Sequence, residues 1–447
     1  MPSDDSFLAV LKRAGRDDAQ DGDRFGGGEG NDGSGLPDGA DGSFRFATGV
    51  ECSNPTIEHG AVRRDLLAET GHYDRFEQDL GLVRDLGLRT LRYGLPIHRV
   101  LPARGVYDWS FADAAMHEMR RLEIEPILDL LHFGVPDWWG DFQNPELPLL
   151  FCDYCDKVAE RYPWVRFYTP VNEIFVTARN SARDGLWNEQ RRDDRSFVTA
   201  MKNLVAADIM GCQALAARRN DLVVVQSESA EYTHDMRASP SPEVKLSNEL
   251  RFLSLDLLYA NPPSADVMLY LLDNGLTREE YAWFMRGEPP GYQIMGCDYY
   301  GRNEKIIKPD GGVCAAEDVL GWYEIVQEYF DRYRKPVMHT ETNVFDPDTA
   351  GQWLWKQWAN ALRMRHAGVP MLGFTWYSLI DQLDWDVQLA EKRGQVNACG
   401  LYDLQRRPRP VAEEFRALLQ EFGRISVMPH AEILTLTNKP AKLKVET

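Results

Sequence analysis

The chain has 447 residues, of which 44% are hydrophobic and 27% charged, and its formal net charge is −19. This is enough for one large α/β barrel with insertions or for two domains, and the composition is that of a soluble globular protein. The negative charge argues against a nucleic-acid partner, and no apolar run approaches the roughly 20 residues of a membrane helix. Seven thinly spread cysteines and the lack of an export signal predict a cytoplasmic protein without a disulfide framework.

The two ends of the chain differ in composition from its middle. Residues 1–42 are rich in Asp and Gly and poor in apolar side chains, which predicts a disordered acidic leader. Within it, Ser6–Arg13 is compatible with an amphipathic turn or a docking peptide, but an unstructured terminus is the favoured interpretation. We expect one folded domain over residues 43–424 and a C-terminal extension over 425–447, with one strand-like segment at Glu432–Thr437 and no assigned function.

From Phe44 onward, short apolar runs alternate with segments of helical period, as in repeated βα units. The expected strands are Phe44–Val50, Thr90–Tyr93, Pro126–Leu131, Val165–Val171, Leu222–Gln226, Ile294–Asp298, Pro336–Thr340 and Met371–Trp376. The expected helices are Tyr73–Leu86, Ser110–Leu122, Phe197–Arg218, Leu320–Tyr333, Thr349–His366 and Val411–Phe422. Eight alternations without a Gly-rich nucleotide fingerprint predict a (β/α)8 TIM barrel rather than an open doubly wound sheet. The long gap from Ser227 to Gln293 predicts an insertion beside the active site, with a helix near Val244–Tyr259.

Two glutamates stand at the carboxyl ends of expected strands. Glu173 follows Thr169-Pro170-Val171-Asn172, and Glu341 follows Pro336-Val337-Met338-His339-Thr340. In a parallel barrel the loops after all strands lie on one face, so both carboxylates are expected at the same mouth. Two carboxylates in one site are what glycoside hydrolysis requires.

Six strand-end motifs occur in an order that resembles the family 1 glycoside hydrolases, the β-glucosidase type, over most of residues 44–422. They are Leu91–Leu95, Leu131–Trp139, Thr169–Ile174, Ile294–Tyr300, Pro336–Glu341 and Gly373–Trp385. The resemblance implies a TIM-barrel enzyme that cleaves a β-linked glycoside or oligosaccharide with retention of configuration, without a cofactor or a metal.

The resemblance also assigns roles to individual residues. It implies that Glu341 is the nucleophile, kept ionised by Arg92 and Tyr300, and that Glu173 is the acid and base, kept neutral by that anion. Further sugar contacts are implied at Asn172, His132, Asp298, Trp376, Tyr377, Asp384 and Trp385, and the aromatic residues, with Trp138 and Trp139, are expected to offer flat faces for sugar rings.

The chain departs from the family pattern mainly where the terminal sugar is held. The departures are Thr56 for glutamine, Asp298 for asparagine, Tyr377 for tryptophan, Asp384 for glutamate, and Thr342-Asn343 for Asn-Gly. The catalytic pair is therefore expected to be intact, while the terminal sugar is expected to be unusual or modified.

Other interpretations stay open at this point. The same glutamates would serve a transglycosidase, and a barrel without turnover that binds a glycan or a protein is a third possibility. Glu228 and Glu231 are rival carboxylates after the fifth strand, although a solvated loop is the favoured interpretation, and Asp184 and Glu189 carry the same ambiguity. Cys152 and Cys155 have redox or zinc spacing but no second pair, so we expect a structural role.

Overall fold

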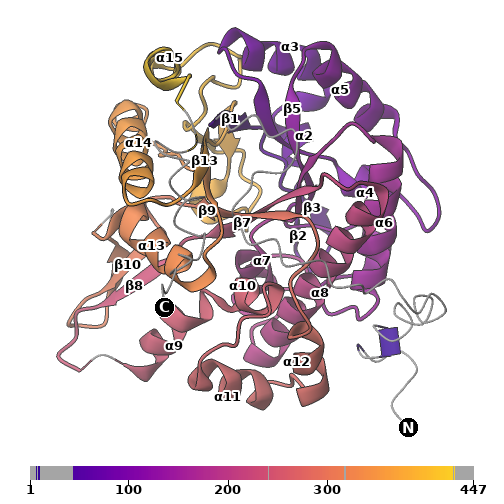
Figure 1. The fold of residues 1–447 in the computed structure, drawn as a ribbon, viewed down its shortest axis with the longest axis vertical. Helices are drawn as coiled ribbons and strands as arrows, with labels where there is room; N and C mark the ends of the chain where they lie inside the picture. The colour runs from indigo at the N-terminus through magenta and orange to yellow at the C-terminus, as the bar shows by residue number, and fades with distance from the viewer. Residues whose placement is uncertain are drawn as a thin grey trace, which may run out of the picture.

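The computed structural model describes residues 7, 9–10, 44–239, 241–316, 319–425 and 427. Its centre is a closed barrel of parallel strands in the order β1-β13-β12-β9-β7-β6-β5-β4 (Figure 1). The strands are β1 Arg45–Gly49, β4 Thr90–Gly94, β5 Glu125–Leu131, β6 Phe167–Val171, β7 Val223–Ser229, β9 Tyr292–Asp298, β12 Val337–Glu341 and β13 Met371–Trp376. The prediction of a (β/α)8 barrel is confirmed, and each expected strand forms within a few residues of its expected bounds.

Helices surround the barrel, with α13 and α14 on one side and α3, α5 and α6 on the other (Figure 1). Their bounds are α3 His72–Asp85, α5 Ser110–Arg121, α6 Leu147–Arg161, α7 Ile174–Ala182, α8 Asp194–Arg218, α13 Gly321–Tyr333, α14 Ala350–His366 and α15 Pro410–Phe422. The six predicted helices all form, with ends within three residues of the prediction. Short elements in the connections are β2 Thr56–Ile57, β3 Val62–Arg63, α2 Leu66–Glu69, α4 Ile97–Val100, β14 Gln382–Leu383 and β15 Val396–Asn397.

The strands have apolar residues on both faces, because both faces are covered. Successive residues point to opposite sides of a strand, so Ile127 packs inside the barrel while Leu128 packs against the helices. β7 shows the same alternation, with Val223 and Val225 inside and Val224 outside. The barrel is therefore a packed core, and it presents its polar residues at the carboxyl ends of the strands.

The insertion between β7 and β9 adds elements at one edge of the barrel (Figure 1). It contains β8 Tyr232–Asp235, α9 Pro242–Leu250, α10 Leu253–Leu258, α11 Ala265–Asp273 and α12 Arg278–Phe284. β8 pairs in parallel with β10 Glu304–Ile307, which pairs with β11 Val313–Ala315. The predicted helix near Val244–Tyr259 forms as two helices, because a turn at Arg251–Phe252 separates α9 from α10.

In the described part of the leader, Phe7 contacts the folded domain. Phe7 is buried and its ring stacks on Phe284 at 6.3 Å, while Lys202 Nζ lies 4.8 Å from the Phe7 ring centre. At Phe7 and the buried Val10, the structure therefore differs from the expected unstructured terminus, because α8 and α12 offer apolar surface to this short segment. The rest of the predicted leader and the segment Glu432–Thr437 lie outside the described residues.

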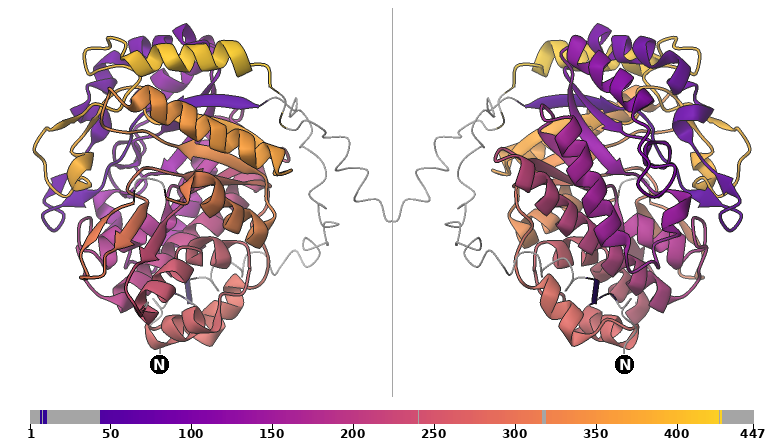
Figure 2. Two further views of the ribbon diagram at one scale, coloured as in Figure 1. Left: turned by 90° about the vertical axis from the view of Figure 1, so that its left-hand side faces the viewer. Right: turned by 90° about the vertical axis from the view of Figure 1, so that its right-hand side faces the viewer.

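The two ends of the barrel domain meet. The Phe44 amide donates a hydrogen bond to the Ile425 carbonyl at 3.4 Å. α15 lies beside α14 on the outer surface, as both views of Figure 2 show. Among the helices of the described part of the chain, none combines the length and the hydropathy needed to span a membrane.

Candidate active site

Four side chains of the site come from the carboxyl ends of barrel strands. Arg92 lies in β4, Asp298 ends β9, Glu341 ends β12, and Glu173 follows β6. Glu173 has a left-handed backbone with φ 42°, and its amide donates to the Ser227 carbonyl at 2.8 Å. This bond to β7 holds an unfavourable conformation that starts α7 and fixes the direction of the Glu173 side chain.

Glu341 is bound by a cation and a hydroxyl. Arg92 Nη1 donates to Oε1 of Glu341, and the Tyr300 hydroxyl donates to Oε2 at 2.6 Å. Burial and the negative charge of Glu341 raise the pKa of Tyr300 well above its usual value, so the phenol remains a donor. Glu341 therefore has the cation and the hydroxyl beside it that the resemblance placed there.

Arg92 is fully buried and connects several elements of the site. Its Nη2 donates to Asp129 Oδ2 at 3.0 Å and to Asn172 Oδ1 at 2.7 Å. Because a guanidinium can only donate, the Asn172 oxygen must face Arg92 and Nδ2 must face His132 Nε2, at 3.3 Å. His132 Nε2 then accepts, and Nδ1 donates to Asp129 Oδ2 at 3.3 Å. Arg92 therefore fixes the orientation of both Asn172 and His132.

Glu173 has the opposite environment to Glu341. It is buried, and burial together with the negative charges of Asp298, Glu341, Glu228 and Glu231 raises its pKa well above the usual value. These surroundings therefore favour the protonated form of Glu173. The two glutamates thus differ in the way that an acid and a nucleophile must differ.

Of the aromatic residues expected at the site, Trp376 and Trp139 are buried in the core, whereas Tyr377 contacts His132. Trp376 is fully buried and its indole N–H donates to the Cys399 carbonyl at 2.9 Å, so the prediction that its ring offers a face to sugar is wrong. Trp139 is likewise buried in the core. Tyr377 stacks on His132 with ring centres 6.3 Å apart, and its hydroxyl donates to the Val50 carbonyl. Tyr377 therefore packs against the His132 ring and helps to hold it in place.

Asp384 does not have a free carboxylate. It is fully buried, accepts from Arg64 Nη2 at 3.0 Å, and accepts from the backbone amides of Arg393, Gly394 and Gln395 at 2.7–3.0 Å. The expectation that it binds a sugar hydroxyl is therefore wrong for this arrangement. Instead, Asp384 holds the loop that carries Trp385 in place.

Glu51 is a site residue that the sequence analysis missed. It lies just after β1, is buried, and accepts from the Ser53 amide at 2.9 Å, Gln382 Nε2 at 2.8 Å and Trp385 Nε1 at 3.0 Å. Burial raises the pKa of Glu51, although the hydrogen bond from the Ser53 amide opposes this shift. The available signal was its position as the first polar residue after a strand, which is the reason His132 was selected.

The rival carboxylates after the fifth strand are not in a solvated loop. Glu228 lies within β7, is buried, and accepts from Ser254 Oγ at 2.6 Å and the Phe175 amide at 3.1 Å. Burial raises its pKa to about 7. Glu231 is paired with Arg179 at 2.6 Å, which outweighs burial and lowers its pKa to about 2. The interpretation of these residues as solvated is corrected, because β7 extends further than expected.

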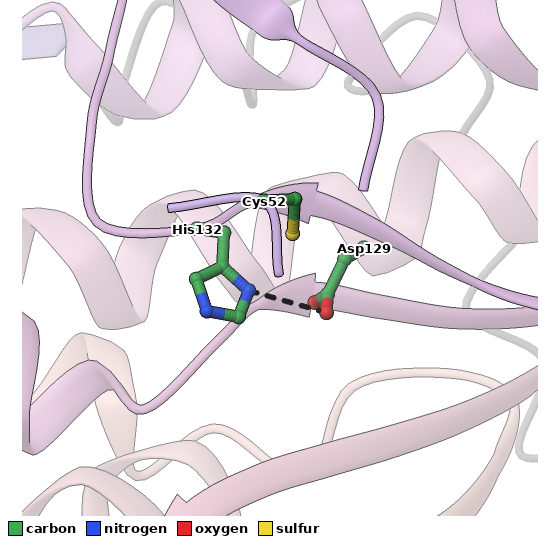
Figure 3. Close-up of side chains that lie close together, drawn as sticks. All are labelled: Cys52, Asp129 and His132. Atoms are coloured by element: carbon green, nitrogen blue, oxygen red, sulfur yellow. Dashed lines mark hydrogen bonds and ion pairs between the residues drawn. The ribbon is translucent and has the colours of Figure 1, made fainter. Parts of the chain in front are cut away.

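The remaining carboxylates and cysteines have structural surroundings. Asp184 is exposed and lies 3.7 Å from Arg179, and Glu189 accepts from Gln143 Nε2 at 2.9 Å. Cys152 and Cys155 lie on α6 and are not bonded to each other. Within the described residues, the group suited to a metal ion is Cys52, Asp129 and His132 (Figure 3).

Part of the chain matches a known family, and its fold matches known structures. Residues 53–261 match the family described as "Glycosyl hydrolase family 1". The "Family 1 b-glucosidase from Thermotoga maritima" has the same fold, with a TM-score of 0.69 and 17% identity, over 85% of this chain and 98% of that one.

The matches to curated relatives cover only part of each relative's sequence. "Aryl-phospho-beta-D-glucosidase BglC" of Bacillus subtilis (strain 168) is 30% identical over 153 residues, 31% of this chain and 32% of the relative. "Galactolipid galactosyltransferase SFR2, chloroplastic" of Arabidopsis thaliana is 20% identical over 356 residues, 74% of this chain and 54% of the relative. The chain thus spans between about a third and just over half of these relatives' lengths. The match over residues 53–261 and the shared fold support the resemblance drawn from the motifs.

Proposed function

We propose that the chain is a retaining β-glycosidase that acts on a small-molecule glycoside or an oligosaccharide. The observation that carries the proposal is the contrast between the two glutamates. Glu341 accepts from Arg92 and Tyr300, whereas Glu173 is buried among other carboxylates and keeps its proton. The family match supports a glycosidase in general terms, and this contrast supports the retaining mechanism.

The reaction proceeds in two displacements at the anomeric carbon. In the first, Glu341 forms a bond to that carbon, the bond to the leaving oxygen breaks, and Glu173 transfers its proton to this oxygen. In the second, Glu173, now a carboxylate, takes a proton from water as the water oxygen displaces Glu341. Asn172 and His132, which Arg92 and Asp129 hold in place, bind hydroxyls of the sugar.

The terminal sugar is bound differently from what the sequence pattern suggested. Asp384 already accepts hydrogen bonds from Arg64 and from backbone amides. Glu51 is therefore the carboxylate on this side of the site that accepts from a sugar hydroxyl. Glu51 Oε1 accepts one hydrogen bond, from the Ser53 amide, and keeps capacity for a sugar hydroxyl. A buried carboxylate here repels phosphate, so we expect an unphosphorylated sugar, unlike the sugars in the name of the Bacillus relative.

Covalent trapping tests the proposal. The protein is incubated with a panel of activated 2-deoxy-2-fluoro β-glycosides, its intact mass is measured, and labelled peptides are mapped. We expect one glycosyl group on Glu341, no label in the Glu341→Gln variant, and the fastest labelling by the preferred sugar. Turnover that yields the inverted anomer, or a label on another residue, would overturn the mechanism. Binding of glycans without any turnover would favour a silent barrel.

Transfer to an acceptor other than water is a second candidate, and one observation favours it. The plant galactolipid galactosyltransferase matches 74% of this chain, more than twice the share matched by the Bacillus relative. Transfer uses the same glutamates, so only the products distinguish the two reactions. Incubation with an aryl glycoside and an alcohol acceptor should yield free sugar if water is preferred, and a new glycoside if transfer dominates.

A further inference from the structure

Three side chains with metal-binding atoms converge beside Arg92. Cys52 follows β1, Asp129 lies in β5, and His132 follows β5, and Figure 3 shows their ends pointing toward one another. One ligand atom from each lies within 4.8 Å of the other two, and all three residues are buried. The mechanism proposed above uses His132 and Asp129 but gives no role to Cys52.

The backbone holds the three residues in this arrangement. The Asn54 amide donates to the His132 carbonyl, and the Leu95 amide donates to the Asp129 carbonyl, both at 3.2 Å. Gly94 provides the space for the thiol, because a Cβ on Gly94 would stand 2.3 Å from Cys52 Sγ. The site is therefore largely formed before any ligand arrives.

One polar atom of the cluster lacks a partner in the protein. Asp129 Oδ2 accepts from Arg92 and His132, but Asp129 Oδ1 is buried without any hydrogen bond. Asp129 as a whole is only 2% exposed. A buried carboxylate oxygen normally has a donor or a cation beside it, so this atom indicates a missing ligand.

A cation at Asp129 Oδ1 would not compete with Arg92. The Arg92 guanidinium is shared between the carboxylates of Asp129 and Glu341, and it contacts the other oxygen of Asp129, Oδ2.

We propose that Cys52, Asp129 and His132 bind a zinc ion. Sulfur, imidazole nitrogen and carboxylate oxygen form a ligand set that suits Zn²⁺, whereas Mg²⁺ and Ca²⁺ prefer oxygen alone. Ligand atoms around tetrahedral zinc stand roughly 3.5 Å apart, so the three side chains close by about 1 Å on binding. The fourth position remains for water.

Binding changes the protonation of two ligands. Cys52 Sγ loses its proton to solvent as the zinc–sulfur bond forms. His132 Nδ1 gives its lone pair to zinc, so the ring proton moves to Nε2, which then faces Asn172 Nδ2 donor to donor. Zinc thus breaks the contact that positions His132 for sugar. On the proposed function, zinc and glycoside exclude each other, and zinc inhibits the enzyme.

Cobalt provides a direct probe of the thiolate. The full-length protein is freed of metal and titrated with Co²⁺, whose bond to a thiolate gives a charge-transfer band in the near ultraviolet. The variants are Cys52→Ser and, as a matched control, Cys152→Ser on α6. We expect one ion per chain and the band in the wild type and in Cys152→Ser, and no band with at least about tenfold weaker binding in Cys52→Ser. An unchanged band in Cys52→Ser, or no binding by the wild type, would overturn the proposal.

Two further measurements separate the zinc site from the enzyme's activity. Zinc should raise the Tm of the wild type but not that of Cys52→Ser, and comparison of the metal-free proteins shows whether the variant folds. Affinity should rise with pH, because a thiol proton is released. Both results hold even if the chain has no glycosidase activity. Zinc should also slow fluoroglycoside labelling of Glu341 in the wild type only, and equal slowing in Cys52→Ser would place an inhibitory ion elsewhere.

Discussion

The two sides of the site differ in how closely they follow the sequence pattern. The glutamate side, formed by Arg92, Asn172, Glu173, Tyr300 and Glu341, has the expected contacts. The β1 side, formed by Glu51, Gln382, Asp384 and Trp385, has a different set of partners. On the proposed function, the chemistry depends on the glutamate side and the choice of sugar on the β1 side, so substitutions on each side should change different quantities.

The largest effect is expected on the glutamate side. Glu173→Ala removes the proton donor, so kcat/KM for glycosides with poor leaving groups should fall by about 10²–10⁴-fold. Activated aryl glycosides, which leave without a proton, should lose far less in the first step. Initial rates on a series of aryl glycosides with different leaving-group pKa values measure this difference. A uniform loss across the series would reject Glu173 as the acid.

On the β1 side, Asp384→Ala should reduce stability more than catalysis. It removes one of the two carboxylates that pair with the buried Arg64, the other being Glu69, and it leaves three backbone amides without their acceptor. Together these losses should cost about 3 kcal/mol in the free energy of unfolding. Urea denaturation measures the loss. Asp386→Ala is a matched control two residues away, because the Asp386–Arg393 pair is partly exposed and should contribute less than about 1 kcal/mol. Equal losses in the two variants would contradict the structural role of Asp384.

Glu51→Gln should change substrate binding with little effect on the chemical step. The new amide group faces the donors of Ser53, Gln382 and Trp385, so the acceptor for sugar is lost or turned away. One hydrogen bond of this kind corresponds to about a tenfold rise in KM. Steady-state kinetics should show this rise with kcat nearly unchanged. A fall in kcat alone would assign Glu51 to the glutamate side.

The smallest expected effect is a shift in pH dependence. Asp298 raises the pKa of Glu173, and the acid must be protonated, so activity is lost as pH rises through that pKa. Asp298→Asn removes the charge and should move the alkaline limb of kcat/KM to lower pH by about one unit or less. Glu228→Gln, which removes a weaker influence, should move it less. A shift of the limb to higher pH would contradict the proposed role of Asp298.

The sequence predicted most of the fold, because the hydrophobic period within each segment and the turn residues between segments determine the strands and helices of a barrel locally. The resemblance to the family placed Arg92 and Tyr300 beside Glu341, and the structure has both contacts. Asp384 could not be predicted, because its partner Arg64 is 320 residues away in a different connection. Glu51 was missed because a single glutamate in a short polar run has no pattern of its own.

The contacts of the Arg92 guanidinium affect how such a site can change during evolution. One guanidinium serves Glu341, Asp129 and Asn172 at once, so any substitution there is felt by three strands together. Glu51 accepts from three separate donors, the Ser53 amide, Gln382 Nε2 and Trp385 Nε1, so one donor can be replaced while the other two remain. A lineage can therefore explore new sugars by single replacements around Glu51, whereas a replacement of Arg92 removes three contacts at once.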